Sequence, residues 1–177
     1  MTSQNLSFNQ IICKRMAFAS FDSLPDSSRV WVYRSSRPFS AEEEMNVNHW
    51  LQQFVDKWTA HNVTLLANAQ VFHSQFIVIT LDENSSTQAS GCSIDSQVRF
   101  ITQIGNQLNI DLFDRLTFDF EIEGKVVSIH KDEVRDLISK GQIKETSQVF
   151  DHLVKTKEAL SNNWLVTLNQ SWHNRLI

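Results

Sequence analysis

The sequence predicts an α+β fold in which helices cover an antiparallel sheet. Segments rich in β-branched and aromatic residues alternate with segments whose apolar residues recur every three to four positions. Through residue 122 these segments follow one another as strand, helix, strand, strand, helix, strand. This order is typical of a ferredoxin-like βαββαβ core with both helices on one face of the sheet. A C-terminal β/α extension follows the core.

The first half of the predicted core contains two strands and a helix. Residues 16–21 alternate apolar and small side chains and predict an edge strand, and residues 29–35 predict the next strand. Ser40 and Glu43 have the spacing of a capping box, which marks a helix start. One apolar face of this helix is formed by Val47, Trp50, Leu51, Phe54, Val55 and Trp58.

The second half contains two strands, a helix and a hairpin. Residues 63–74 and 76–82 predict two strands joined by a turn at 73–75. The following helix begins near residue 93, and its apolar face is formed by Ile94, Val98, Ile101, Ile104 and Leu108. A hairpin is expected with its turn at Glu123 and Gly124. We expect residues 30–35, 64–72, 76–82 and 116–122 to share one antiparallel sheet.

The extension is predicted to hold three short elements. A helix near 132–139 is stopped by Gly141, a second helix covers 156–164, and a strand covers 164–168. With only four glycines and two prolines the chain has few natural linkers. We therefore expect a flexible N-terminus over residues 1–15 and a single α+β domain over residues 16–177.

Composition narrows the classes of function. The net charge is −4, from 16 Lys and Arg against 20 Asp and Glu, which gives no electrostatic reason to expect nucleic-acid binding. No run of 18 apolar residues and no signal-peptide pattern is present, so we expect a cytoplasmic protein that does not enter a membrane. The six histidines are scattered, and neither Cys13 nor Cys92 belongs to a metal-binding pattern. We expect no metal, no cofactor and reduced thiols.

Several short stretches occur together in a combination that resembles a known family: WVYRSSR, WTAH, FIVITLDE, SGCSID, LFDR and the terminal SWH. This chain is similar, from about Ser27 to His173, to a family of small bacterial proteins often labelled ABC transporter ATPase. The resemblance implies no activity, because none has been established for that family.

The ATPase label is not supported by the residues. A phosphate-binding P-loop requires G-x-x-x-x-G-K-[ST]. The four glycines are Gly91, Gly105, Gly124 and Gly141, and no two of them are five positions apart. Only Gly124 is followed by a lysine, and Val126 then stands where Ser or Thr is required. We therefore expect no nucleotide hydrolysis.

The stretch from Ala89 to Asp95 is the first candidate site, and it has three interpretations. In the first, Ser90 or Ser93 caps the helix, Gly91 makes the bend, Asp95 complements the helix dipole and Cys92 packs inside. In the second, the helix N-terminus favours a reactive Cys92 thiolate, with a base supplied by His61, His73, His130 or His173. In the third, the backbone N–H groups of this turn hold an anion.

Arg34 and Arg37 form the second candidate, because their planar guanidinium groups can grip a carboxylate or a phosphate. A solvated pair of arginines is the alternative. The ligand-binding set predicted from the sequence is therefore Arg34, Arg37, Ser90, Gly91, Cys92, Ser93 and Asp95.

Three functions are compatible with these residues. The leading one is a non-enzymatic binding or interaction module for a small anionic ligand or a protein partner. The second is a cysteine-based enzyme or redox sensor that uses Cys92. The third is a nucleic-acid binder in which Trp31 and Tyr33 stack on bases, which the net acidity disfavours. Trp172, close to the C-terminus, is expected to anchor the tail to its own domain.

Overall fold

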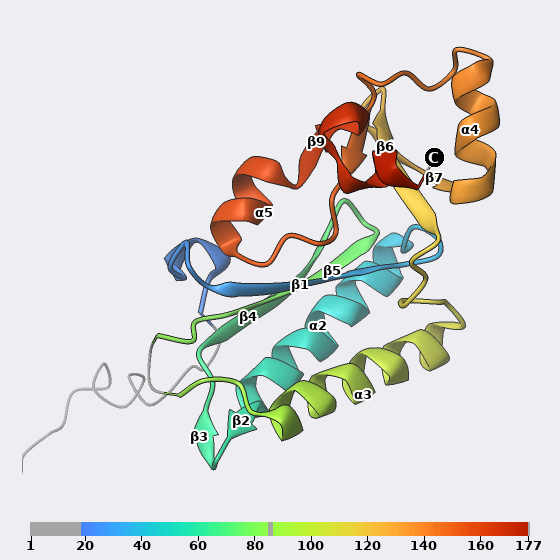
Figure 1. Cartoon of the computed structure of the whole chain (residues 1–177). Helices are drawn as coiled ribbons and strands as arrows, with labels where there is room; N and C mark the ends of the chain where they lie inside the picture. Colours follow the sequence, from blue (N-terminus) through green and yellow to red (C-terminus); the bar gives the residue numbers. More distant parts are fainter. Residues whose placement is uncertain (1–18, 85–86, 177) are drawn as a thin grey trace, which may run out of the picture.

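The computed structural model describes residues 19–84 and 87–176 (Figure 1). The α-helices are α2 (Ala41–Lys57), α3 (Gly91–Leu108), α4 (Lys131–Ser139) and α5 (Lys157–Asn163), and the 3₁₀ helices are η1 (Phe21–Ser23), η2 (Leu168–Gln170) and η3 (Trp172–Arg175). The strands are β1 (Arg29–Arg34), β2 (Thr59–Ala60), β3 (Val63–Thr64), β4 (Ala67–Phe72), β5 (Phe76–Leu81), β6 (Thr117–Ile122), β7 (Lys125–His130), β8 (Gln148–Phe150) and β9 (Leu165–Thr167). The fold is α+β with antiparallel sheets.

The first sheet has the order β1-β5-β4, and both of its pairings are antiparallel. All six residues of β5 are buried, as expected for a central strand that is continuously apolar from Phe76 to Ile79. Helices α2 and α3 lie together on one face of this sheet (Figure 1). Their buried residues and those of the sheet share one core, formed among others by Val47, Leu51, Val55, Ile101, Ile104, Ile77 and Ile79. The prediction that both helices cover the same face is confirmed.

The start of α2 is determined by its local sequence. The Ser40 hydroxyl accepts a hydrogen bond from the Glu43 N–H at 3.2 Å, and the Glu43 carboxylate accepts one from the Ser40 N–H at 2.9 Å. The predicted capping box is confirmed, and it satisfies two backbone donors that a helix start otherwise leaves without partners.

The opposite face of the first sheet is covered by the C-terminal part of the chain. Val30, Phe76 and Val78 of the sheet pack against Phe150, Leu160 and Trp164. Because Leu160 belongs to α5, this helix lies on the side of the sheet opposite α2 and α3 (Figure 1). Both faces of the first sheet are therefore buried.

A second sheet has the order β7-β6-β8-β9, with antiparallel pairing throughout. Strands β6 and β7 form the predicted hairpin, and Glu123 and Gly124 at its turn have positive φ angles of 51° and 76°. Phe118 and Phe120 of β6 pack against Val134 of α4 and Leu168. The elements predicted for the extension as a helix, a helix and a strand are present as α4, α5 and β9.

The ferredoxin-like topology is not confirmed, because the fourth strand of the expected sheet lies elsewhere. In that topology β6 would pair with the outer edge of β1. Instead β6 pairs with its hairpin partner β7 on one side and with β8 on the other. The start of the β1 edge is occupied by the C-terminal part of the chain, through a bridge between Arg29 and Thr156. A two-residue hairpin forms from neighbouring residues and needs no long loop closure, which favours the β6–β7 pair.

Two smaller predictions are also corrected. The edge strand expected at 16–21 is not present in its described part, where Phe21 begins the 3₁₀ helix η1, and residues 16–18 lie outside the described residues, as do residues 1–15. The strand expected over 63–74 is divided into β3 and β4. Strand β3 forms a small hairpin with β2, and its turn residues His61 and Asn62 have φ angles of 50° and 62°.

Candidate functional site

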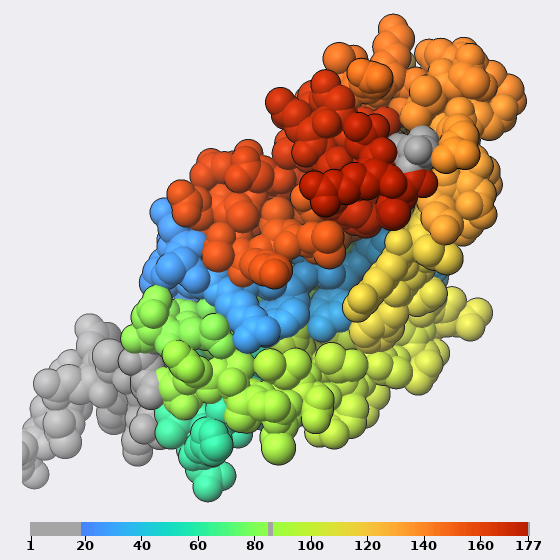
Figure 2. Space-filling view, in the orientation of Figure 1, coloured from blue at the N-terminus to red at the C-terminus, as the bar shows by residue number. Residues whose placement is uncertain are grey.

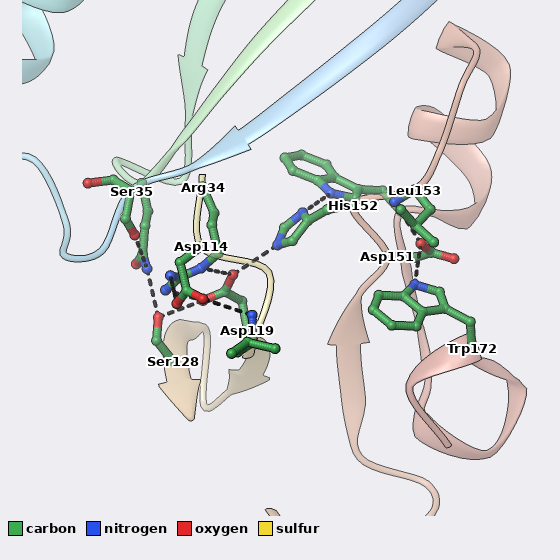
Figure 3. A network of polar contacts seen from close by, with 12 residues as sticks. Arg34, Ser35, Asp114, Asp119, Ser128, Asp151, His152, Leu153 and Trp172 are labelled. Carbon is green, nitrogen blue, oxygen red and sulfur yellow. Dashed lines mark hydrogen bonds and ion pairs between the residues drawn. The ribbon is translucent and has the colours of Figure 1, made fainter. Parts of the chain in front are cut away.

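Arg34, the last residue of β1, is joined to Asp119, in the middle of β6. The Nε–H and Nη2–H groups of Arg34 donate to Oδ2 and Oδ1 of Asp119 at 2.8 and 3.2 Å (Figure 3). The two residues are 5% and 0% exposed. A buried, bidentate arginine–carboxylate pair has a defined geometry and is costly to break from one side. This ion pair connects the first sheet to the second.

Asp119 accepts two further hydrogen bonds, one from Ser128 Oγ at 2.5 Å and one from His152 Nε2 at 2.9 Å (Figure 3). The indole N–H of Trp164 donates to His152 Nδ1 at 3.3 Å. Because an indole nitrogen only donates, Nδ1 must accept, and the ring proton lies on Nε2, facing Asp119. Both nitrogens of His152 are therefore occupied.

The charge of Asp119 is maintained by these partners. Burial alone would favour the neutral carboxylic acid, but the hydrogen bonds from His152 and Arg34 outweigh burial. The pKa of Asp119 therefore lies below its ordinary value. The carboxylate is ionised at neutral pH although its side chain is fully buried.

Asp114 is a second carboxylate on Arg34, placed by the connection between α3 and β6. Its Oδ2 accepts a hydrogen bond from Arg34 Nη1 at 3.2 Å, and its Oδ1 accepts one from the Leu116 N–H at 2.8 Å. Burial opposes its ionisation, whereas the Thr117 hydroxyl, the Leu116 N–H and Arg34 favour it, and the pKa of Asp114 is lowered. Asp114, Arg34, Asp119, His152 and Ser128 form what we call the Arg34–Asp119 network.

A cavity of about 240 Å³ lies beside this network, where the two sheets meet. We call it the inter-sheet cavity. It is lined by Val32, Tyr33, Arg34, Leu112, Phe113, Asp114, Arg115, Thr117, Phe118, His152, Leu153, Trp172 and His173. Its walls are thus largely apolar, with a few polar groups directed by rigid elements. This composition is typical of small-molecule sites, although most sites for drug-sized ligands are larger, roughly 300–1,000 Å³.

His173 is a buried polar residue in the wall of the inter-sheet cavity. Its Nδ1 lies 2.6 Å from Ser171 Oγ, and its Nε2 has no hydrogen-bond partner within residues 19–84 and 87–176. Burial lowers the pKa of His173 to about 4, so the ring is neutral at pH 7. A neutral imidazole ring therefore lines the cavity.

Tyr33 and Arg115 supply further donors. Tyr33 accepts a hydrogen bond from Gln97 Nε2 at 3.2 Å, and its own O–H has no acceptor among the described residues. Burial raises the pKa of Tyr33, so the hydroxyl keeps its proton. Arg115 is exposed and forms no ion pair within the described part of the chain. It is the one cationic side chain of the cavity that the network leaves without a carboxylate.

The candidate turn at Ser90–Asp95 does not line the inter-sheet cavity. Ser90 caps α3 by accepting from the Ser93 N–H at 3.2 Å, which confirms the capped helix start, and the Ser93 hydroxyl lies 2.8 Å from the Ser90 nitrogen. Cys92 is exposed, so the prediction that it packs inside is wrong. Gly91 is the first helical residue, with nothing within 4 Å of a Cβ built on it, and Asp95 is exposed.

Cys92 lines a surface groove of about 680 Å³ between α2 and α3. His61 lines the same groove, whereas His73, His130 and His173 do not. Arg34 is not part of this groove, so the structure does not bring Cys92 and Arg34 into one cavity. Among the predicted ligand-binding residues, only Arg34 lies in the inter-sheet cavity.

Arg37 is exposed and already paired. Its guanidinium donates to both oxygens of Glu43 at 2.7 Å, and the pKa of Glu43 is lowered to about 2 by the hydrogen bonds from Arg37 and from the Ser40 N–H. Arg37 therefore reinforces the N-terminus of α2. The expected grip of Arg34 and Arg37 on a single ligand is not assembled.

Trp31 and Tyr33, considered for base stacking, lie on the face of the first sheet that α2 and α3 cover. Trp31 contacts Trp58 edge to face, with ring centroids 6.2 Å apart. Trp172 anchors the C-terminal segment as predicted, because its indole N–H donates to Asp151 Oδ1 at 2.9 Å (Figure 3).

Sequence reasoning did not single out Asp119 or His152. An aspartate within a strand is unusual, and Asp119 stands between Phe118 and Phe120, which was the one available signal. Strand alternation, however, also predicts a polar residue at that position. His152 gave no signal, because its partners are distant in the sequence.

Within the described ranges, no group of three or more His, Cys, Asp or Glu side chains has an arrangement that could hold a metal ion. In the same ranges, none of the helices combines the length and the apolar character that crossing a bilayer requires.

Comparison of the chain with models of protein families, with curated proteins and with solved structures found no match. The resemblance to the family labelled ABC transporter ATPase therefore stays a prediction.

Proposed function

We propose that this protein is a binding module that holds a small anionic molecule in the inter-sheet cavity. One observation carries the proposal: the exposed Arg115 has no carboxylate partner among the described residues, and it lines the same cavity as Tyr33 and His173, two polar residues that can hydrogen-bond a ligand. An anionic group would pair with Arg115, and an apolar body would lie against the apolar wall.

Arg34 contributes to the cavity mainly as a positioning residue. Three of its N–H groups point to Asp114 and Asp119, so the guanidinium is held in one orientation. Two of its five N–H donors remain for a ligand. Because the two carboxylates balance more than its own charge, the attraction for an anion must come chiefly from Arg115.

The same contacts favour binding over catalysis. His152 is bonded at both ring nitrogens, so it has no lone pair with which to take a proton from a ligand. The Ser128 hydroxyl is bonded to Asp119 and accepts from Gln75 Nε2 at 2.7 Å. Neither residue has the arrangement of a nucleophile beside a free base.

The cavity is favoured over the Ser90–Asp95 turn for a physical reason. The turn offers the N-terminus of α3, but its capping box already uses the Ser93 N–H, and no buried polar group without a partner faces it among the described residues. Thiol chemistry at Cys92 is the second candidate, because Cys92 is exposed and His61 lines the same groove.

Phenyl phosphate is a suitable probe, because it joins a small apolar ring to a dianion. Amide chemical shifts of ¹⁵N-labelled protein would be followed during its titration, with phenol as the neutral control. We expect shifts at Tyr33, Phe118 and Trp172, and a weaker response to phenol. The Arg115→Gln variant should bind about tenfold more weakly, since one charge-assisted hydrogen bond is lost.

Arg99→Gln, which changes an exposed arginine of α3, is the matched control and should bind like the wild type. Equal affinity for phenol and phenyl phosphate would contradict the proposal. Shifts confined to residues 90–95 would also contradict it, and they would support the anion site predicted from the sequence.

A further inference from the structure

The outer edge of β1 offers unpaired backbone groups. In the pairing with β5 the odd-numbered residues exchange hydrogen bonds, as the bond from the Ser35 N–H to the Gln75 carbonyl at 2.8 Å indicates. The even-numbered residues face outward, and the Val30 N–H accordingly donates to the Lys155 carbonyl at 2.9 Å. Beyond this bond the Val30 C=O, the Val32 N–H and C=O, and the Arg34 N–H have no backbone partner among the described residues.

At the other edge of the first sheet, backbone groups of β4 have hydrogen-bond partners. On β4, the Val71 N–H donates to the side chain of Asn48 at 2.9 Å, and the Ala67 carbonyl accepts from the Ala19 N–H at 3.2 Å. Edge strands are usually protected in this way, or by charges and prolines within the strand. The stretch of β1 between Arg29 and Arg34 has neither device, because its residues are Val30, Trp31, Val32 and Tyr33.

Val30 and Val32, which carry most of these unpaired groups, line a groove of about 620 Å³ between β1 and residues 152–156, which we call the edge groove. Figure 2 shows β1 atoms (blue) between the orange C-terminal segment and the green α3. The groove is lined by Ser27, Arg29, Val30, Trp31, Val32, Tyr33, Glu83, Arg115 and residues 152–156. Because it is recessed, it can admit a single extended chain while hindering the approach of another whole sheet.

The charges of the edge groove are mostly positive. Three cations line it, Arg29, Arg115 and Lys155, and the acid Glu83 pairs with Arg29 at 3.4 Å. Arg115 and Lys155 have no ion-pair partner in the described part of the chain. The groove therefore differs from the chain as a whole, whose net charge is −4. Charge complementarity selects an acidic occupant.

We infer that the edge groove binds an extended acidic segment of a partner protein, which adds to the first sheet as a strand beside β1. Backbone hydrogen bonds to the Val30 C=O and to the N–H and C=O of Val32 supply affinity, and acidic side chains beside Arg115 and Lys155 supply specificity. The part of β1 that lines the groove beyond Arg29 runs from Val30 to Tyr33, so it spans about 13 Å and pairs with about four residues of the partner. This function is distinct from ligand binding in the inter-sheet cavity, and Arg115 lines both sites.

The test begins with selection from a displayed library of random decapeptides against the whole protein. We expect the selected peptides to be acidic, with alternating side chains. For one such peptide, amide hydrogen exchange of the protein would be measured with and without the peptide. Exchange at Val32 should slow by at least about tenfold, because its N–H becomes hydrogen-bonded. A version of the peptide N-methylated at alternate residues keeps the charge and should lose binding.

Two charge-reversal variants test whether a loss of binding comes from the charge of the edge groove or from a general effect on the fold. Lys155→Glu should weaken the selected peptide about tenfold or more by placing like charges together, whereas Lys140→Glu, on the exposed end of α4, should leave binding unchanged. Lys155→Glu should also leave phenyl phosphate binding unchanged, since Lys155 does not line the inter-sheet cavity. Failure of one proposal is thus distinguishable from failure of the other.

Three outcomes would overturn the inference: no enrichment of acidic peptides, binding that leaves Val32 exchange unaltered, or tolerance of N-methylation. Single-stranded dT₈ serves as a further probe. If it bound more tightly than the selected peptide and protected Trp31 and Tyr33, the groove would be a nucleic-acid site and the peptide assignment would be wrong.

Discussion

Arg34 and Asp119 are 85 positions apart in the sequence, and they form a buried bidentate ion pair at 2.8 and 3.2 Å. Arg34 ends a strand of the first sheet, and Asp119 lies inside a strand of the second. The pair therefore sets the relation between the two sheets, and with it the shape of the cavity between them. It also orients the guanidinium that forms part of the cavity wall.

Asp119→Asn should destabilise the protein by about 3–5 kcal/mol, because it leaves the buried Arg34 without its main counter-charge. Urea unfolding followed by tryptophan fluorescence would measure the loss. Asp132→Asn, an exposed carboxyl of α4, is the control and should change stability by less than about 0.5 kcal/mol. A loss below about 1 kcal/mol for Asp119→Asn would mean that the ion pair is not buried in solution.

Stability should also fall as the pH decreases from about 6.5 to 4. Burial lowers the pKa of His173 from 6.5 to about 4, so within this window the unfolded chain takes up a proton that the folded chain does not. His173 should account for a loss on the order of 2 to 3 kcal/mol. His73, whose pKa burial also lowers, adds to the loss in the same direction.

Asp119 acts at lower pH. Its pKa lies below 3.8 in the folded state, so its stabilising charge is fully present above that value and is lost as the pH falls through the lowered pKa. Unfolding free energies measured from pH 7.5 to 3 would reveal both effects. His173→Gln should flatten the curve between pH 6.5 and 4, and His49→Gln, at an exposed site of α2, should not. An unchanged slope in His173→Gln would show that His173 is not buried as a neutral ring.

The elements of the fold were largely predictable, because their signals are local. The capping box of Ser40 and Glu43 and the turn at Glu123 and Gly124 each depend on a few neighbouring residues. The assignment of β6 to a sheet was not predictable in this way. Its periodicity is the same in either sheet, and the choice depends on pairing with β8, whose residues follow much later in the chain.

The candidate site was predicted only in part. Arg34 was identified because it ends a strand beside a second arginine, but that arginine, Arg37, pairs locally with Glu43 instead. Asp119 contacts Arg34, and His152 contacts Asp119, through tertiary contacts that a single sequence does not reveal. The turn around Cys92 attracted attention because helix-start residues and reactive-site residues are the same types.

Gly105 is required by packing rather than by backbone conformation. A Cβ at this position would lie 2.9 Å from the Ile110 carbonyl oxygen, which belongs to the backbone and cannot move independently. Gly105→Ala should therefore cost about 1–3 kcal/mol, although alanine is the better helix former. Gly91→Ala is the matched control, because nothing lies within 4 Å and the change should be neutral or slightly stabilising. Equal stabilities of the two variants in thermal unfolding would refute the close contact at Gly105.

Cys92 should react with iodoacetamide in the native protein, because its side chain is exposed at the start of α3. The measurement uses Cys13→Ser protein, so that one thiol is left, and a short peptide containing the same residues 89–95 as the reference. A rate near that of the peptide is expected. A rate well above it would favour the thiol-based function, and reaction only in denaturant would contradict the exposed position.

The central claim, that the inter-sheet cavity binds a small anion, is tested most directly by a crystal structure with 4-bromophenyl phosphate. The bromine gives an anomalous signal that locates the ligand independently of the protein atoms. We predict one bromine peak in the inter-sheet cavity, against its apolar wall, with the phosphate beside Arg115, and no peak in crystals of Arg115→Gln grown under the same conditions. A peak at the Ser90–Asp95 turn, or an empty inter-sheet cavity at saturating ligand, would contradict the claim.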